Sequence, residues 1–192
     1  MRQAQIDRKT RETDISLFLS LDGGEADVST GIGFFDHMLT ALAVHAGFGL
    51  RVRCDGDLAV DGHHTVEDVG ICLGQAFAQA MEDKAGITRY GTAFIPMDEA
   101  LGFAAVDISG RPFLVYDAAL PQERVGEFDS CLALEFMRSF AYNARITLHV
   151  RAQYGENSHH MIEAMFKAVA HALKQAVSRT GNDTLLSTKG AL

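Results

Sequence analysis

The sequence contains no tryptophan, only three prolines and three cysteines, and no apolar run long enough to span a membrane. Three widely spaced cysteines without a Cys-x-x-Cys pair argue against a disulfide framework and fit a reducing compartment, so we expect a cytoplasmic protein. The first thirteen residues are polar and lack the apolar core of a signal peptide. Basic residues are also in the minority, and the net charge of −8 argues against a nucleic-acid partner.

The remaining composition is that of a globular protein. The chain has 192 residues, of which 47% are hydrophobic and 22% are charged. A chain of this size buries roughly 70% of the surface that it exposes when unfolded, so it can build a core without disulfides or structural zinc. We therefore expect a single domain over residues 1–192.

The sequence repeats itself at an offset of about half its length. The segment His63-His64-Thr65-Val66-Glu67 returns as His159-His160-Met161-Ile162-Glu163. After each histidine doublet, apolar residues recur at steps of three and four, which is the pattern of a helix with one buried face. Each His-His-x-x-Glu motif therefore opens a predicted amphipathic helix of about 15 to 20 residues.

A second pair of segments extends the repeat toward the N-terminus. Residues 37–53 align with residues 135–151, and both are predicted to form a helix, a short turn and a strand. Alternating patterns predict further strands over 15–21, 99–108 and 113–116, and residues 82–91 are predicted to form a plain connector. The expected fold is α+β with two similar halves, about 8–90 and about 91–192. Each half is a β-sheet packed on one face by helices and contains one of the two motif helices.

The repeated motif carries potential metal ligands. On a helix, a glutamate three or four residues after two histidines lies on the same side as both. Imidazole and carboxylate groups without thiolate favour manganese or iron(II) over structural zinc. For a single doublet, a surface histidine pair beside a helix dipole would explain the residues equally well. Two copies at matched positions favour the metal ligands. With His37 and its repeat counterpart Glu135, the expected metal ligands are His37, His63, His64, Glu67, Glu135, His159, His160 and Glu163.

Six motifs follow one another along the chain: TGIGFFDHML (30–39), DGHHTVED (61–68), DISGRP (107–112), GENSHH (155–160), FKA (166–168) and STKG (187–190). In this order they resemble the imidazoleglycerol-phosphate dehydratase family, and the resemblance extends from about Arg8 to the end of the chain. It implies a metal-dependent hydro-lyase of histidine biosynthesis, which converts imidazoleglycerol phosphate to imidazoleacetol phosphate plus water. It also implies two Mn²⁺ ions per active site, and sites shared between subunits of a 24-chain assembly. We expect the monofunctional form, because 192 residues leave no room for the phosphatase domain fused to some relatives.

The resemblance also implies roles for single residues. Glu12 matches a glutamate that contacts substrate and is our candidate for the general base, with Glu67 and Glu163 as further catalytic carboxylates. Two positions depart from the common pattern, because Glu135 stands where many relatives have histidine and Ala41 where glutamine is common. The implied phosphate-binding residues are Arg89, Arg111, Lys167, Ser187 and Lys189.

Two other functions compete with the dehydratase. A different dinuclear-metal hydrolase would use a metal-bound water as nucleophile and release a cleaved group. A non-enzymatic metal-binding or storage assembly would need the histidine doublets but no phosphate-binding cations. Without the resemblance, the residues themselves indicate only a duplicated α+β protein that binds a pair of metal ions.

Overall fold

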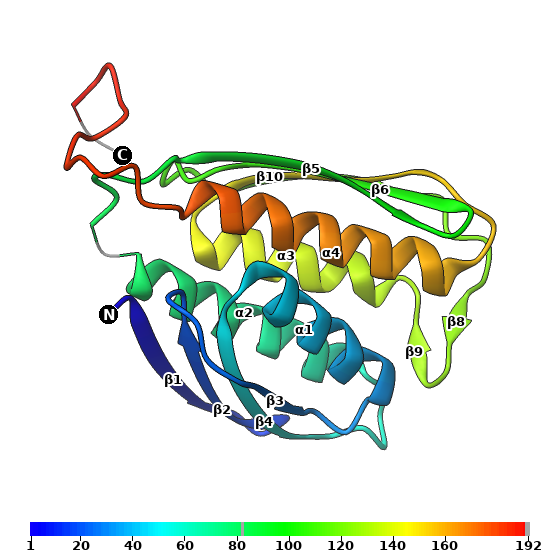
Figure 1. The fold of residues 1–192 in the computed structure, drawn as a ribbon. Coiled ribbons are helices and arrows are strands. Elements are labelled where there is room, and N and C mark those ends of the chain that lie inside the picture. Colours follow the sequence, from blue (N-terminus) through cyan, green and yellow to red (C-terminus); the bar gives the residue numbers. More distant parts are fainter. Residues whose placement is uncertain (82, 191–192) are drawn as a thin grey trace.

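The computed structural model describes residues 1–81 and 83–190. Two four-stranded sheets form the outside of the molecule, and helices fill the space between them (Figure 1). The first sheet has the strand order β1-β2-β4-β3 and the second has the order β5-β6-β10-β7. The first half contains β1 (Gln3–Lys9), β2 (Thr13–Ser20), β3 (Ala26–Ser29), α1 (Gly33–Ala46), β4 (Gly49–Gly56) and α2 (His63–Ala80). The second half contains β5 (Tyr90–Met97), β6 (Ala100–Asp107), β7 (Phe113–Asp117), β8 (Arg124–Val125), β9 (Phe128–Asp129), α3 (Leu132–Ala144), β10 (Thr147–Tyr154) and α4 (Ser158–Ala176).

The two halves have the same topology. Each begins with an antiparallel hairpin, β1–β2 or β5–β6. Each then forms a parallel crossover, in which α1 connects β3 to β4 and α3 connects β7 to β10. The duplicated α+β fold, with a sheet packed by helices in each half, is therefore confirmed. The motif helices α2 and α4 begin where the doublets predict, and their lengths of 18 and 19 residues fall in the expected range.

Three strands of the two large sheets were not anticipated from the sequence, namely β1, β3 and β5. On β1, only alternate residues of moderate size such as Ala4 and Ile6 face the interior, so the hydrophobic alternation is weak. On β5, the outer face carries the large apolar side chain of Phe94, which is 57% exposed and hides the alternation. The prediction of a plain connector covers residues 82–91, of which residue 82 lies outside the described part of the chain. It is wrong at its C-terminal end, because Tyr90 and Gly91 already pair with β6.

A small hairpin, β8–β9, distinguishes the second half from the first. It lies in the connection between β7 and α3, whereas the matching link between β3 and α1 is only a few residues long. Phe128 anchors this hairpin, because its fully buried ring packs against Phe34 and Phe35 at 5.4 and 6.0 Å between ring centroids. The hairpin is thereby fixed against the first turn of α1.

One hydrophobic core joins the two halves, since buried residues of all four long helices and both large sheets belong to a single cluster. The closest contact between the halves is the pair α2 and α3. Two glycines on α2 permit it, because a Cβ atom on Gly70 would lie 2.9 Å from the Cβ of Ser139. A Cβ atom on Gly74 would lie 2.7 Å from the carbonyl oxygen of Phe140.

This close contact predicts a large effect of one methyl group. We expect Gly74→Ala to lower the free energy of unfolding by about 1 to 3 kcal/mol, because the backbone of α3 cannot move away without disturbing the core. Urea unfolding followed by circular dichroism measures the loss. Gly33→Ala is the matched control, since a Cβ atom there would meet nothing within 4 Å outside its own helix backbone, and alanine favours a helix. Equal stability of the two variants would contradict this account.

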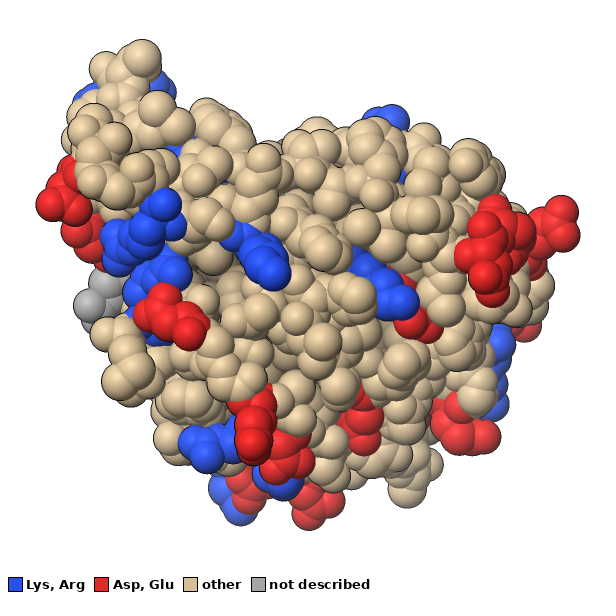
Figure 2. All heavy atoms as spheres, in the orientation of Figure 1, with Lys and Arg blue, Asp and Glu red and all other residues tan. Residues whose placement is uncertain are grey.

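Charged side chains are distributed unevenly over the face of the molecule that Figure 2 shows. Figure 2 shows an acidic group at the end where the turn between β5 and β6 lies, and several Lys and Arg side chains toward the C-terminal segment. The middle of this face, over α1 and α4, carries few charges. Among the described residues, no helix combines the length and the apolar character that a membrane crossing requires.

Candidate metal centre and phosphate pocket

The start of α4 and the start of α1 bring three predicted metal ligands together. Nε2 of His37 and Nε2 of His159 each lie 3.2 Å from the same carboxylate oxygen, Oε2 of Glu163. The ligand atoms of this group, which we call the metal cluster, all lie within 4.8 Å of one another. In the part of the chain that the structure describes, no other group of three or more His, Cys, Asp or Glu meets that limit. Two imidazoles and a carboxylate at this spacing suit a divalent first-row metal.

Glu163 is the buried centre of the cluster. Only 7% of its side chain is exposed, and its second oxygen, Oε1, accepts a hydrogen bond of 2.6 Å from Nζ of Lys167. Burial opposes ionisation, but the hydrogen bonds from Lys167 and His37 outweigh it and hold the pKa of Glu163 below its usual value. The carboxylate is therefore ionised and directed at both imidazoles.

Aromatic and capping contacts hold this arrangement. The ring of Phe34 meets the rings of His37 and His159 edge-on, with centroid distances of 6.4 and 4.9 Å. Asn157 caps α4, because its side chain accepts a hydrogen bond of 2.9 Å from the backbone N–H of His159. The apolar wall limits the motion of the imidazoles, and the cap fixes the first turn that carries the doublet.

The second histidine of each doublet has different surroundings. Nδ1 of His64 lies 3.0 and 3.1 Å from the two carboxylate oxygens of Asp57, and Nδ1 of His160 lies 2.7 Å from Oε2 of Glu99. These hydrogen bonds raise the pKa of both histidines. Nε2 of His64 is 3.8 Å from Oε1 of Glu12, so the candidate base lies beside a candidate metal ligand.

The turn that carries Glu12 is held from three sides. Oγ1 of Thr10 accepts hydrogen bonds of 3.0 Å from the N–H groups of Glu12 and Thr13. The carbonyl of Glu12 accepts a hydrogen bond from the N–H of Asp57, and Oγ1 of Thr13 donates to the buried carboxylate of Asp68 at 2.6 Å. The backbone position of Glu12 is thus independent of its own side chain.

The remaining predicted ligands lie on the pair α2 and α3. His63 and Glu67 are partly buried on α2, and Glu135 is partly buried on α3. The carboxylate of Glu135 is bound by Arg138 of the next helical turn, at 2.7 and 2.9 Å. By the internal repeat, these three residues are the counterparts of His159, Glu163 and His37.

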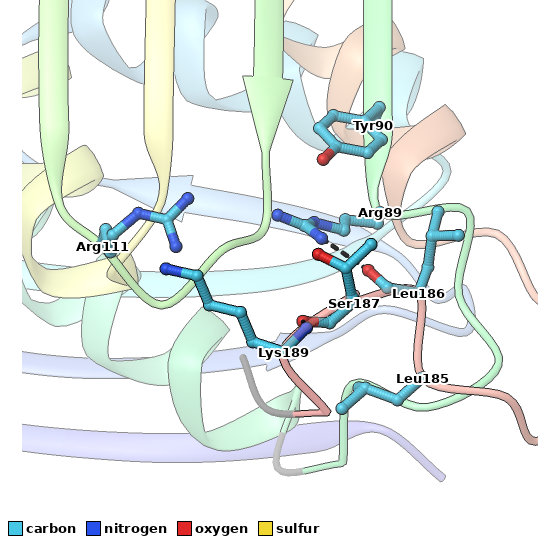
Figure 3. A pocket seen from close by; sticks show the side chains of 8 residues that line it. Arg89, Tyr90, Arg111, Leu185, Leu186, Ser187 and Lys189 are labelled. Carbon is cyan, nitrogen blue, oxygen red and sulfur yellow. Dashed lines mark hydrogen bonds between the residues drawn. The ribbon is translucent and has the colours of Figure 1, made fainter.

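Four of the five predicted phosphate-binding residues line one cavity of about 600 Å³, which we call the phosphate pocket. The guanidinium groups of Arg89 and Arg111 point toward each other across this cavity, and the side chain of Lys189 extends toward Arg111 (Figure 3). The pocket is lined by Arg89, Tyr90, Arg111, Leu185, Leu186, Ser187, Thr188 and Lys189. Lys167 does not line it and instead binds Glu163 of the metal cluster.

Arg89 is the fixed member of the pocket. Its residue is 8% exposed, and its guanidinium donates to both carboxylate oxygens of Asp107, at 2.7 and 3.2 Å, and to the carbonyl of Leu186. The contact with Leu186 draws the C-terminal segment over the arginine. Arg111 is exposed and lies 3.7 Å from the same Asp107 carboxylate. One buried and two exposed cations around a cavity suit a dianionic phosphate group.

Several residues of these sites carry no signal in the sequence. Asp57 and Glu99 are not repeat counterparts of each other, and only folding brings them to the histidines. Asp107 lies inside a motif, but its contact with Arg89 depends on the pairing of β5 with β6. Phe34 also lies inside a motif, but its contact with the ring of His159 forms only when the two halves pack together.

A family model described as imidazoleglycerol-phosphate dehydratase matches residues 30–173, which include both histidine doublets. The chain belongs to the imidazoleglycerol-phosphate dehydratase family. The resemblance inferred from the six motifs is therefore confirmed. A dehydratase removes water, so the chain is an enzyme of the hydro-lyase class.

Members of the imidazoleglycerol-phosphate dehydratase family match over the whole chain. The protein of that name from Symbiobacterium thermophilum is 58% identical, with 100% of this chain and 93% of the relative covered. The one from an Exiguobacterium species is 55% identical, with 99% of this chain and 98% of the relative covered. The crystal structure of the Staphylococcus aureus dehydratase is 42% identical, covers 93% of this chain and 99% of its own, and superimposes with a TM-score of 0.86.

Proposed function

We propose that this chain converts imidazoleglycerol phosphate to imidazoleacetol phosphate plus water in histidine biosynthesis, and that it uses two Mn²⁺ ions per active site. The observation that carries the proposal is the metal cluster, in which one buried, ionised carboxylate faces two imidazoles. The substrate is the one in the names of the relatives. We further propose a cytoplasmic location, which the three free cysteines support.

The donor set fits two Mn²⁺ ions. One group consists of His37, His159 and Glu163, whose ligand atoms lie close together. We propose that their repeat counterparts form the second group. When bound, the ions would act as Lewis acids that stabilise negative charge on the imidazole ring of the substrate and help its hydroxyl to leave. The proposed ligands of the second group are Glu135, His63 and Glu67, and the proposed ligands that complete the sites are His64 and His160.

The distance between the metal cluster and the phosphate pocket supports sites shared between subunits. The cluster lies at the start of α4, whereas Arg89 is attached to the other end of this helix by the hydrogen bond from its N–H to the carbonyl of Ala176. At 1.5 Å per residue, about 25 Å of helix separates them. A small phosphorylated substrate is too short to reach both in one chain. We therefore propose that the pocket of one subunit faces the cluster of another. The number of 24 chains in the proposed assembly rests on the family resemblance alone.

The remaining roles are proton removal, phosphate binding and support of the metal cluster, and each is assigned to side chains of this protein. The carboxylate of Glu12 takes the proton from the carbon next to the departing hydroxyl. The guanidinium groups of Arg89 and Arg111, with Ser187 and Lys189, bind the phosphate and fix the substrate. Lys167 holds Glu163 in its ionised form and presents a further cation beside the metal cluster.

Turnover by the metal-free protein tests the proposal. The protein is stripped with a chelator and then assayed with imidazoleglycerol phosphate, with and without added Mn²⁺. We expect the ketone product only when Mn²⁺ is present. Release of inorganic phosphate instead of ketone would favour a metal-dependent hydrolase. Tight Mn²⁺ binding without any product would favour a storage assembly.

A further inference from the structure

We infer that Asp57 and Glu99 are positioning residues, which hold His64 and His160 so that the Nε2 atom of each imidazole is available to a metal ion. The inference rests on the proposed metal-dependent function and adds two residues that neither the repeat nor the family motifs single out. Both act through a histidine rather than on the substrate.

The neighbouring carboxylate determines which ring nitrogen of each histidine carries the proton. An ionised carboxylate can only accept hydrogen bonds, so Nδ1 of each histidine must donate to it. In a neutral imidazole the other nitrogen, Nε2, then carries the lone pair that a metal requires. Both oxygens of the Glu99 side chain act as acceptors, because one also receives hydrogen bonds from the backbone N–H groups of Glu156 and Asn157.

The two halves place a carboxylate at Nδ1 of the second histidine with residues that are not repeat counterparts. His64 and His160 occupy matching positions in the repeat. Asp57, however, lies in the loop between β4 and α2, whereas Glu99 lies in the turn between β5 and β6. Duplication alone explains the two histidines but not their two carboxylates. A requirement for a free Nε2 at both positions explains the coincidence.

The carboxylate of Glu99 is held in one orientation by the backbone before α4. Its Oε1 atom accepts hydrogen bonds from the N–H groups of Glu156 and Asn157, at 3.1 and 2.8 Å, while Oε2 faces His160. The start of α4 is itself fixed, because the N–H of Gln122 donates to Oγ of Ser158 at 2.9 Å and the Gln122 amide oxygen accepts from the N–H of Ser158. The imidazole of His160 is therefore held by a carboxylate that cannot easily turn.

This geometry makes Glu99→Gln a sharp test. The amide oxygen of the new side chain must accept the two backbone N–H groups, so its NH₂ group is left facing His160. An NH₂ group can only donate, so His160 shifts to the form in which Nε2 carries the proton and cannot bind a metal. Asp57→Asn should act more weakly, because both oxygens of Asp57 face His64 and the amide can rotate to present its oxygen.

Two measurements on the full-length chain test the inference. Solid-state ¹⁵N NMR of metal-free, histidine-labelled protein at pH 8.5 reports which ring nitrogen carries the proton, with His160→Gln assigning the signal. Titration calorimetry with MnCl₂ reports affinity. We expect Glu99→Gln to move the His160 proton from Nδ1 to Nε2 and to weaken Mn²⁺ binding by about 10- to 100-fold. Glu156→Gln removes a neighbouring exposed charge and should change neither quantity.

The possible failures are distinguishable. If His160→Gln loses Mn²⁺ but Glu99→Gln keeps both the proton on Nδ1 and normal affinity, the positioning role is wrong while the metal assignment stands. If His160→Gln binds Mn²⁺ as tightly as the unmodified chain, His160 is not a ligand and the proposed function itself fails at this residue.

Discussion

Glu163→Gln should eliminate Mn²⁺ binding at the metal cluster and lower kcat by about 10³-fold or more. The substitution keeps the shape of the side chain but removes the negative charge between His37 and His159. It also leaves Lys167 without its carboxylate partner in a site that is largely buried. The Lewis-acid contribution of a metal amounts to several kcal/mol, and each 1.36 kcal/mol corresponds to about a tenfold change in rate.

Metal content and initial rate, measured on the same purified sample, check this expectation. Circular dichroism and thermal unfolding show whether the variant remains folded. Glu156→Gln serves as the control, because it removes an exposed carboxylate two residues before the start of the same helix. A Glu163→Gln variant that retains two Mn²⁺ ions per site would remove this carboxylate from the ligand set.

Glu12→Gln should lower kcat by about 10²- to 10⁴-fold and leave the bound Mn²⁺ unchanged. A general base contributes this range of rate, and an amide cannot accept the proton. The fold around it should persist, because the hydrogen bonds from Glu12 N–H to Thr10 and from Asp57 N–H to the Glu12 carbonyl involve only its backbone. Metal analysis together with steady-state kinetics measures both parts of the expectation.

The combination of results identifies the role of Glu12. A loss of rate with full metal content supports the base, whereas a parallel loss of metal would identify Glu12 as a ligand beside His64. A nearly normal kcat would assign proton removal to another group. Glu25→Gln, a charge change in the same half, should leave the rate unaffected, because Glu25 lies beside Leu50 at the opposite end of β4 from Asp57.

The sequence predicted the parts of the fold that its periodicity encodes. The stripes after each doublet indicated α2 and α4, and the repeat indicated the two like halves. Neither pattern revealed β5, whose outer face is apolar, nor the β8–β9 hairpin, which has no counterpart in the first half. Short strands and insertions leave little periodic signal, so they depend on contacts that form only in three dimensions.

The candidate sites show the same division. Spacing on one helix suffices to associate His159 with Glu163, but His37 joins them from the other half of the chain. Lys167 was predicted to bind the phosphate because it lies in the FKA motif. Its contact with Glu163 arises because the two residues are one helical turn apart on α4, which the motif does not show. Glu99 meets His160 through a hairpin turn far away in the sequence. Ligand types were thus predictable, whereas their partners across the fold were not.

The arrangement of sheets outside and helices inside has a consequence for how the protein unfolds. The helix faces that point away from each sheet are buried against the helices of the other half. At Gly70 and Gly74, α2 and α3 lie so close that water has no space between them. A separated half would therefore lack part of its hydrophobic core. In this respect the halves resemble the subunits of an obligate dimer, which have no stable folded monomer. The halves should therefore melt in one cooperative transition. Because a single chain joins them, their pairing does not depend on the concentration of the protein.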